Sequence, residues 1–263
     1  MLFRRDGFGV ISSWVVAWCF LLSACGPRAS EPEITSAPLQ EKAAAASKFL
    51  DPTTTGTIKG KVFFEGTSPA LVDLPIRGNP ECAVFHPSGA IRSEELLVEN
   101  GLLRNVFVYV KQGLEGHAFQ VPPSPVTVEN KRCVYVPHVV GVQAGQPLLL
   151  INDDPTLHNV HLYSKSNRAF NLGLPFQGMK QTKKFDAPEV MMTLKCDVHP
   201  WMLGYVGVLP HPFFAVTGMD GTFELKGLPP GEYVLEAWHE KLGPQTLTVN
   251  VGPQETKDIE FRF

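Results

Sequence analysis

Apolar and polar residues alternate along most of the chain beyond residue 56, and this pattern predicts β-strands. Residues 57–65 and 105–111 show it most clearly, and they are rich in the β-branched and aromatic side chains that favour extended backbone. Turn signals such as Asp220-Gly221 and the Pro-Pro-Gly at 229–231 separate the segments. Short strands at this spacing are typical of β-sandwiches, so the predicted fold class is all-β. The other expected strands are 126–128, 134–136, 147–151, 160–163, 190–195, 205–209, 222–225, 233–238, 245–251 and 257–263.

The N-terminus has a different pattern. Arg4 and Arg5 precede an apolar run over 8–22, and small residues follow it. This is the pattern of an export signal, because a transmembrane helix usually needs about 20 apolar residues. Leu-Ser-Ala-Cys at 22–25 resembles the lipobox of bacterial lipoproteins, and the resemblance implies cleavage before Cys25 and lipidation of its thiol. An uncleaved membrane anchor is the alternative.

The residues after Cys25 predict where the protein is anchored and how its folded part is attached. Gly26 stands where an Asp would indicate retention in the inner membrane, so we expect an exported protein that is lipid-anchored in the outer membrane and faces the periplasm. Residues 26–55 are rich in Ala, Ser, Thr, Pro and Glu and predict a flexible tether. The formal net charge is -3, without a basic stripe, so no nucleic-acid partner is expected.

One short segment gathers the residue types of a copper site. Residues 194–202 read Leu-Lys-Cys-Asp-Val-His-Pro-Trp-Met, and His158 lies upstream in Leu-His-Asn-Val-His. A soft thiolate, two imidazoles and a weak thioether together favour a mononuclear blue copper centre. The loop between the strands expected at 190–195 and 205–209 would turn Cys196, His199 and Met202 toward one point, with His158 arriving from a neighbouring strand.

The two motifs resemble the cupredoxins, and the amicyanins most closely. The resemblance implies a Greek-key β-sandwich that transfers single electrons to a redox partner protein. It also implies one type 1 copper with His158, Cys196 and His199 as equatorial ligands and Met202 as the axial ligand. Asn159 is implied to link the two ligand loops by hydrogen bonds.

The same resemblance implies that His199 reaches the surface inside an apolar patch. Here Pro200, Trp201 and Leu203 would form that patch and serve for docking. Packing of Trp201 into a neighbouring sandwich is the alternative.

The residues around the motifs disfavour two other functions. Zinc also binds Cys and His, but methionine is a poor zinc ligand. Copper enzymes couple a blue site to a further copper through His residues beside the Cys, whereas Lys195 and Asp197 stand there, so no enzyme is expected. A copper-binding or carbohydrate- or wall-binding module without a redox role is the alternative function.

The C-terminal part resembles a second family. Over 214–263 an Asp-Gly turn, a Gly-Leu-Pro-Pro-Gly turn and a Tyr-x-Leu strand resemble the carboxypeptidase regulatory-like domain, a small transthyretin-like sandwich. Such domains often start with a strand like that at 57–62, so the small sandwich is hypothesised to be discontinuous around the copper domain. The expected organisation is a signal peptide at 1–24, a tether at 25–55, an N-terminal β region at 56–124 with a share in the small sandwich left open, a cupredoxin-like domain at 125–210 and the regulatory-like sandwich at 211–263.

Several residues beyond the proposed ligands also carry possible chemistry. His161 shares a strand face with His158, which favours a supporting or surface role over ligation. His239-Glu240 is read as an exposed pair. Cys82 and Cys133 are expected to form a disulfide in an oxidising compartment. A second metal site with the nearby His86 and His138 is the alternative.

Overall fold

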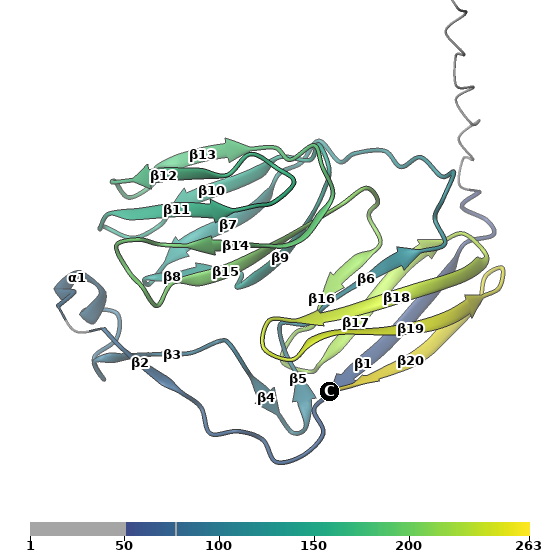
Figure 1. The fold of residues 1–263 in the computed structure, drawn as a ribbon, viewed down its shortest axis with the longest axis horizontal. Coiled ribbons are helices and arrows are strands. Elements are labelled where there is room, and N and C mark those ends of the chain that lie inside the picture. Colours follow the sequence, from purple (N-terminus) through teal and green to yellow (C-terminus); the bar gives the residue numbers. More distant parts are fainter. Residues whose placement is uncertain (1–50, 77) are drawn as a thin grey trace, which may run out of the picture. The chain divides into compact units, whose positions relative to one another are not determined.

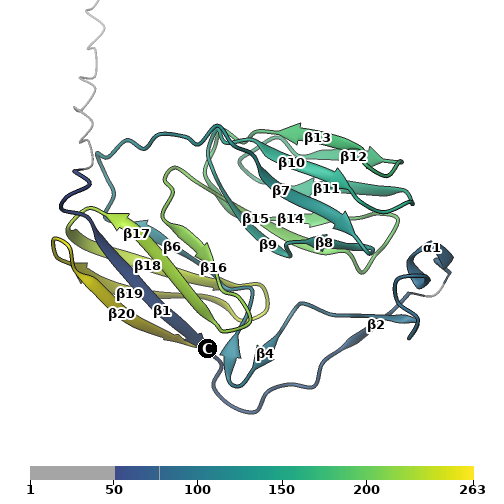
Figure 2. The same ribbon diagram turned by 180° about the vertical axis from the view of Figure 1, so that it is seen from behind.

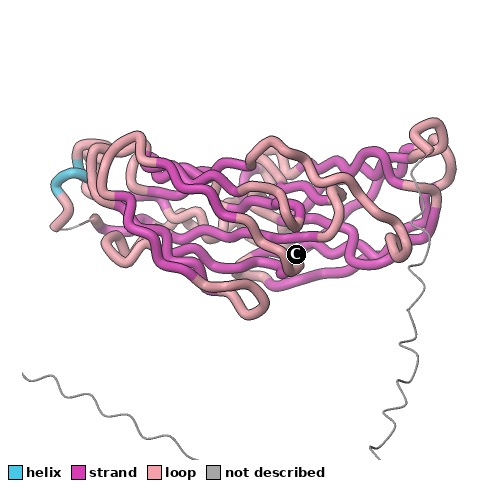
Figure 3. The backbone as a smooth tube through the Cα atoms, turned by 90° about the horizontal axis from the view of Figure 1, so that it is seen from above, coloured by secondary structure: helices cyan, strands magenta, loops and turns pink. Residues whose placement is uncertain are grey.

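The structure, a computed structural model, describes residues 51–76 and 78–263. The predicted signal peptide, the lipidation site Cys25 and nearly all of the tether lie outside the described residues. Within these ranges the chain forms twenty strands and one short helix, which confirms the all-β prediction (Figure 3). The described residues include no helix that is long and apolar enough to cross a membrane.

The first sandwich carries the predicted copper ligands. A four-stranded sheet in the order β13-β10-β7-β8 packs against a five-stranded sheet in the order β12-β11-β14-β15-β9 (Figure 1). Val128, Leu150, Leu162 and Val206 come from both sheets and share one buried core. The strands are β7 (Val126–Lys131), β8 (Val134–Val136), β9 (Val139–Gln143), β10 (Leu148–Asn152), β11 (His158–Tyr163), β12 (Phe170–Leu174), β13 (Lys180–Lys183), β14 (Glu189–Lys195) and β15 (Leu203–Leu209).

The second sandwich is discontinuous in sequence. Its first sheet runs β17-β1-β5-β4, with β20 paired in parallel to β1, and its second runs β16-β6-β18-β19 (Figure 2). Strands from before and after the first sandwich therefore bury a common core that includes Ile58, Leu103, Phe223 and Leu235. The strands are β1 (Gly56–Phe63), β4 (Val98–Glu99), β5 (Leu102–Leu103), β6 (Phe107–Gln112), β16 (Phe214–Val216), β17 (Thr222–Leu228), β18 (Gly231–His239), β19 (Gly243–Val251) and β20 (Thr256–Arg262).

Aromatic rings fill the contact between the two sandwiches. Phe107 and Trp238 of the second sandwich cluster there with Leu209 of the first. Gly207 on β15 leaves room for this contact, because a Cβ atom there would lie 2.7 Å from the Phe107 ring. The two sandwiches are therefore in direct side-chain contact.

The expectation of an exposed His239-Glu240 pair is wrong. His239 is 1% exposed, and only 4% of the Glu240 side chain is exposed. His239 ends β18, and Glu240 follows it in the turn to β19 and pairs with the buried His138. Burial lowers the pKa of His239 to about 4, so its imidazole is neutral at pH 7.

A small hairpin lies outside both sandwiches. It consists of β2 (Asp73–Pro75), β3 (Ala90–Arg92) and, between them, the helix α1 (Pro80–Ala83). We call residues 73–92, apart from Arg77, the cap. A disulfide joins Cys82 of α1 to Cys133 between β7 and β8, with a sequence separation of 51 residues. The cap is thereby fixed to the first sandwich.

Candidate metal centre

One loop between adjacent strands carries three of the predicted ligands. β14 and β15 pair antiparallel up to Lys195 and Leu203, and the loop 196–202 connects them, which confirms the predicted adjacency. The loop is closed by backbone hydrogen bonds, from Cys196 N to Met202 O at 3.3 Å and from Met202 N to His199 O at 2.9 Å. The loop geometry is therefore set by its own backbone and by the strand pair that supports it.

The structure brings His158 to this loop. His158 is the first residue of β11, which pairs with β14. Its Nδ1 lies 3.0 Å from Nδ1 of His199, and the Cys196 sulfur lies 3.7 Å from the same His199 nitrogen. One ligand atom from each of these three residues falls within 4.8 Å of the others.

The site is dry and its donors suit copper. Exposed fractions are 0% for His158, 3% for Cys196 and 2% for His199. Met202 is 1% exposed and packs in the same core cluster as Cys196. Cys196 is also the free thiol of the described residues. One buried thiol and two imidazole nitrogens directed at one point, with a thioether in the same cluster, fit copper by donor type.

The site favours the thiolate form of Cys196. Burial raises the pKa of the Cys196 thiol, but the hydrogen bonds with His158 and His199 outweigh burial and lower it to about 6. For His158 burial lowers the pKa, and the hydrogen bonds to Asp154 and Cys196 reverse the direction and raise it. The thiolate, which is the form that binds metal, is thus available at neutral pH.

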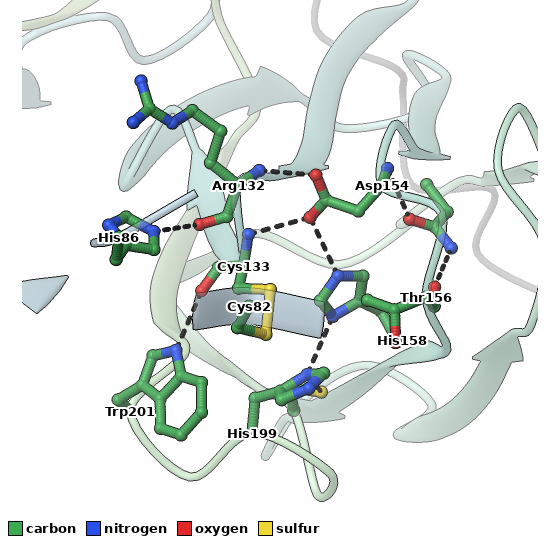
Figure 4. The surroundings of a disulfide bond; sticks show 11 residues. Cys82, His86, Arg132, Cys133, Asp154, Thr156, His158, His199 and Trp201 are labelled. Carbon is green, nitrogen blue, oxygen red and sulfur yellow. Dashed lines mark hydrogen bonds and ion pairs between the residues drawn. A yellow bond between two sulfur atoms is a disulfide. The ribbon is translucent and has the colours of Figure 1, made fainter. Parts of the chain in front are cut away.

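Asp154 orients His158 and was missed by the sequence analysis. Its Oδ2 lies 2.9 Å from His158 Nε2 (Figure 4). The same carboxylate accepts backbone N–H bonds from Arg132 at 2.6 Å and from Cys133 at 2.8 Å. Burial raises the pKa of Asp154, but these three bonds together lower it, so the group stays ionised. An ionised Asp154 accepts the Nε2 proton of His158, so Nδ1 is the ring nitrogen that faces His199 and that a metal would take.

Asn159 joins the two ligand segments. Its Oδ1 accepts from the Cys196 thiol at 3.2 Å and from the Asp197 N–H at 2.7 Å. The side chain that follows the first ligand therefore holds the loop that carries the others. This is the geometry that the linking role of Asn159 requires.

The cap covers the side of the site that was expected to be open. Both sulfurs of the Cys82–Cys133 disulfide lie within 4.8 Å of a His199 ring nitrogen (Figure 4). Trp201 donates from Nε1 to Cys133 O at 2.9 Å and packs in the disulfide cluster. His199 therefore does not reach the surface, although Pro200 is exposed. Trp201 packs against the disulfide rather than into the second sandwich.

The remaining candidates lie apart from the three converging ligands. Leu203 is half-buried at the start of β15. His161 bonds Asp197 at 3.1 Å. His86 Nε2 bonds the backbone oxygen of Arg132 at 2.7 Å. With Cys82 and Cys133 bonded to each other, the structure assembles a disulfide from this pair rather than a second metal site with His86 and His138.

No family model and no curated protein matches the chain. Among solved structures, a copper-containing nitrite reductase from Thermus scotoductus SA-01 is similar over 35% of this chain and 24% of its own, at 22% identity and a TM-score of 0.31. A Cu(I) amicyanin mutant is similar over 34% of this chain and 86% of its own, at 22% identity and a TM-score of 0.29. A purple cupredoxin from Nitrosopumilus maritimus is similar over 31% and 97%, at 22% identity and a TM-score of 0.27.

Proposed function

We propose that this protein is a one-electron carrier built on a single type 1 copper site. The observation that carries the proposal is the convergence of Cys196, His158 and His199 in a site that is almost completely closed to water. When bound, copper would supply a Cu(II)/Cu(I) couple whose potential would be set by the Cys196 thiolate, the two imidazoles and the Met202 thioether.

The protein restricts the conformations of these ligand side chains. His158 is fixed through Asp154, the loop is fixed through Asn159, and Cys196 lies at the end of a paired strand. Ligands that cannot rearrange limit the reorganisation that accompanies a change in the metal's charge. This rigidity supports electron transfer over copper storage or delivery.

The finer points of the proposal follow from the sequence. The ligand motifs resemble cupredoxins, and the C-terminal sandwich resembles the carboxypeptidase regulatory-like domain. The lipobox-like Cys25 supports an exported, lipid-anchored protein that faces the periplasm and meets a redox partner protein there. A non-enzymatic role accords with Lys195 and Asp197 beside the ligand Cys196.

Spectroelectrochemistry of the copper-loaded protein tests the proposal. We expect one reversible transition that follows the Nernst equation for one electron, in the wild type and in Met202→Leu, with a raised potential in the variant because the axial ligand tunes the site. Cys196→Ala should lose the transition. Copper that binds but cannot be cycled reversibly would favour a binding module without a redox role.

A further inference from the structure

The site has a second route to the surface, away from the cap. On the cap side His199 is 2% exposed behind the disulfide, so a partner cannot touch the imidazole edge directly. A separate set of hydrogen bonds between side chains leads outward from beside Cys196 through Asn159, Asn171 and Asp197.

The inner part of this route starts at the ligand sulfur. Asn159 Oδ1 lies 3.2 Å from the Cys196 sulfur, and the Asn159 backbone hydrogen-bonds the same sulfur. Asn159 Nδ2 donates to Asn171 Oδ1 at 2.7 Å and to Asp197 Oδ2 at 3.0 Å. Asn171 Nδ2 donates in turn to Asp197 Oδ2 at 2.6 Å. The three polar side chains form one connected cluster that abuts the sulfur.

The outer part ends on two stacked rings. Asp197 Oδ1 lies 3.1 Å from His161 Nδ1, and the Tyr163 hydroxyl lies 3.2 Å from the same nitrogen. The two rings stack with centroids 4.3 Å apart and an interplanar angle of 25°. Tyr163 is 46% exposed, and Lys195 Nζ lies 5.5 Å from the Tyr163 ring centroid. Hydrogen bonds and stacked rings thus connect the ligand sulfur to solvent.

We propose that electrons enter and leave through the stacked His161–Tyr163 pair rather than through the edge of His199. The proposal rests on the proposed electron-transfer function and names its surface. One electron passes from a one-electron reductant to the oxidised site, and no bond forms or breaks. Electrons tunnel more readily along hydrogen bonds and stacked rings than across open gaps, and this chain of contacts ends at a Tyr163 ring that a reductant can touch, whereas His199 is buried.

Charge changes on the two sides of the site separate the routes. Lys195→Glu reverses a charge beside Tyr163, and Glu81→Lys reverses a charge on the exposed helix α1. The two changes in charge are equal in size and opposite in sign. Copper-loaded full-length protein is reduced by hexacyanoferrate(II), an anion, and by hexaammineruthenium(II), a cation. The ratio of the two rate constants cancels any shift in potential that a variant causes.

We expect Lys195→Glu to lower the anion-to-cation rate ratio by about fivefold or more at low ionic strength, and Glu81→Lys to leave it nearly unchanged. A ratio that responds to Glu81→Lys alone, to both variants equally or to neither overturns the proposal. A wild-type protein that shows no copper absorption spectrum would instead count against the proposed function. Failure of the proposed route and failure of the proposed function are therefore distinguishable.

A readout without electron transfer completes the test. Hexacyanochromate(III), a paramagnetic and redox-inert anion, is titrated into the Cu(I)-loaded protein while backbone amide signals are recorded by NMR. We expect line broadening centred on Tyr163 and Lys195 that Lys195→Glu removes. Broadening centred on α1 and Trp201 would overturn the assignment of the surface.

Discussion

At the scale of single residues, the acidity of Cys196 is the property most open to measurement. In the metal-free protein we expect thiolate absorbance to appear with a midpoint near pH 6, because the bonds with His158 and His199 lower the pKa of the thiol to about 6. An ordinary cysteine titrates at roughly 8.5. The difference spectrum between wild type and Cys196→Ser isolates this group. A midpoint near the ordinary value would contradict the account of the site.

The same shift makes stability depend on pH. The folded-state pKa of Cys196 lies below the unfolded one, so the thiolate's contribution to stability is complete above the unfolded pKa and is lost as the pH falls through about 6.

Asp154 provides a second test at this scale. Asp154→Asn removes the charge that orients His158, so we expect copper affinity to fall by about 10- to 100-fold while the fold is kept. Competition with a chelator measures the affinity. Asp153→Asn is the matched control, because the neighbouring carboxylate pairs with Lys131 near the surface. Equal losses in both variants would show that Asp154 has no specific role in orienting His158.

The proposed ligand residues could be predicted from the sequence, whereas the residues that position them could be predicted only in part. Cys196, His199 and Met202 stand close together on one predicted loop, so local spacing suffices to find them. Asp154 lies in an Asp-Asp-Pro turn whose local chemistry explains it fully as a turn residue. Its role depends on where the backbone N–H groups of Arg132 and Cys133 lie, which is a matter of tertiary structure.

At the scale of elements, the cap and its disulfide should matter to both stability and access. Replacing Cys82 and Cys133 by Ser together should lower the free energy of unfolding by about 2–4 kcal/mol, since a 51-residue separation is no longer cross-linked. Urea unfolding measures this change.

The variant without the disulfide should also release copper to a chelator faster, because the cap over His199 is no longer cross-linked to the first sandwich. A Cys82→Ala and Cys133→Ala pair controls for burial of the new hydroxyls. Unchanged release rates in both pairs would show that the cap does not shield the site.

Most strands inside the sheets were predicted, and most of the missed strands lie at edges, although the edge strands β8, β17 and β19 were predicted and the internal strand β5 was missed. β10 is a run of four apolar residues, and β14 has Val190, Met192 and Leu194 at alternate positions. β12 also alternates apolar residues but is short and buries only one residue of five, and β13 has no apolar residue. The strands of the cap, β2 and β3, are only three residues long each, which is too short for periodicity to be visible. Pairing with a neighbour, rather than side-chain pattern, makes these segments strands.

At the scale of the whole molecule, the covering of His199 could not be predicted. Pro200, Trp201 and Leu203 read locally as an exposed apolar rim. The group that covers the site is attached through Cys82, more than a hundred residues upstream. A contact made through a distant disulfide leaves only a weak signal in a single sequence. The discontinuity of the second sandwich, in contrast, was hypothesised from the strand at 57–62, and β1 pairs with β17 and β20.

Anchoring is also a property of the whole molecule. If Cys25 carries a lipid, Cys25→Ser should remain unlipidated and uncleaved at this site, so its mass should differ from that of the mature wild type. Detergent partitioning and intact-mass measurement of protein from a bacterial host test this. Identical masses for the two proteins would exclude lipidation at Cys25. The Cys19→Ser variant is the matched control within the predicted signal.

The absorption spectrum of the oxidised, copper-loaded protein tests the central claim most directly. Cys196 is the thiol that converges with His158 and His199, so we expect a strong thiolate-to-copper charge-transfer band in the visible region. The band should be absent in Cys196→Ala and present in Cys82→Ala with Cys133→Ala. A colourless Cu(II) form of the wild type, or a band that survives in Cys196→Ala, would contradict the assignment of a type 1 copper site.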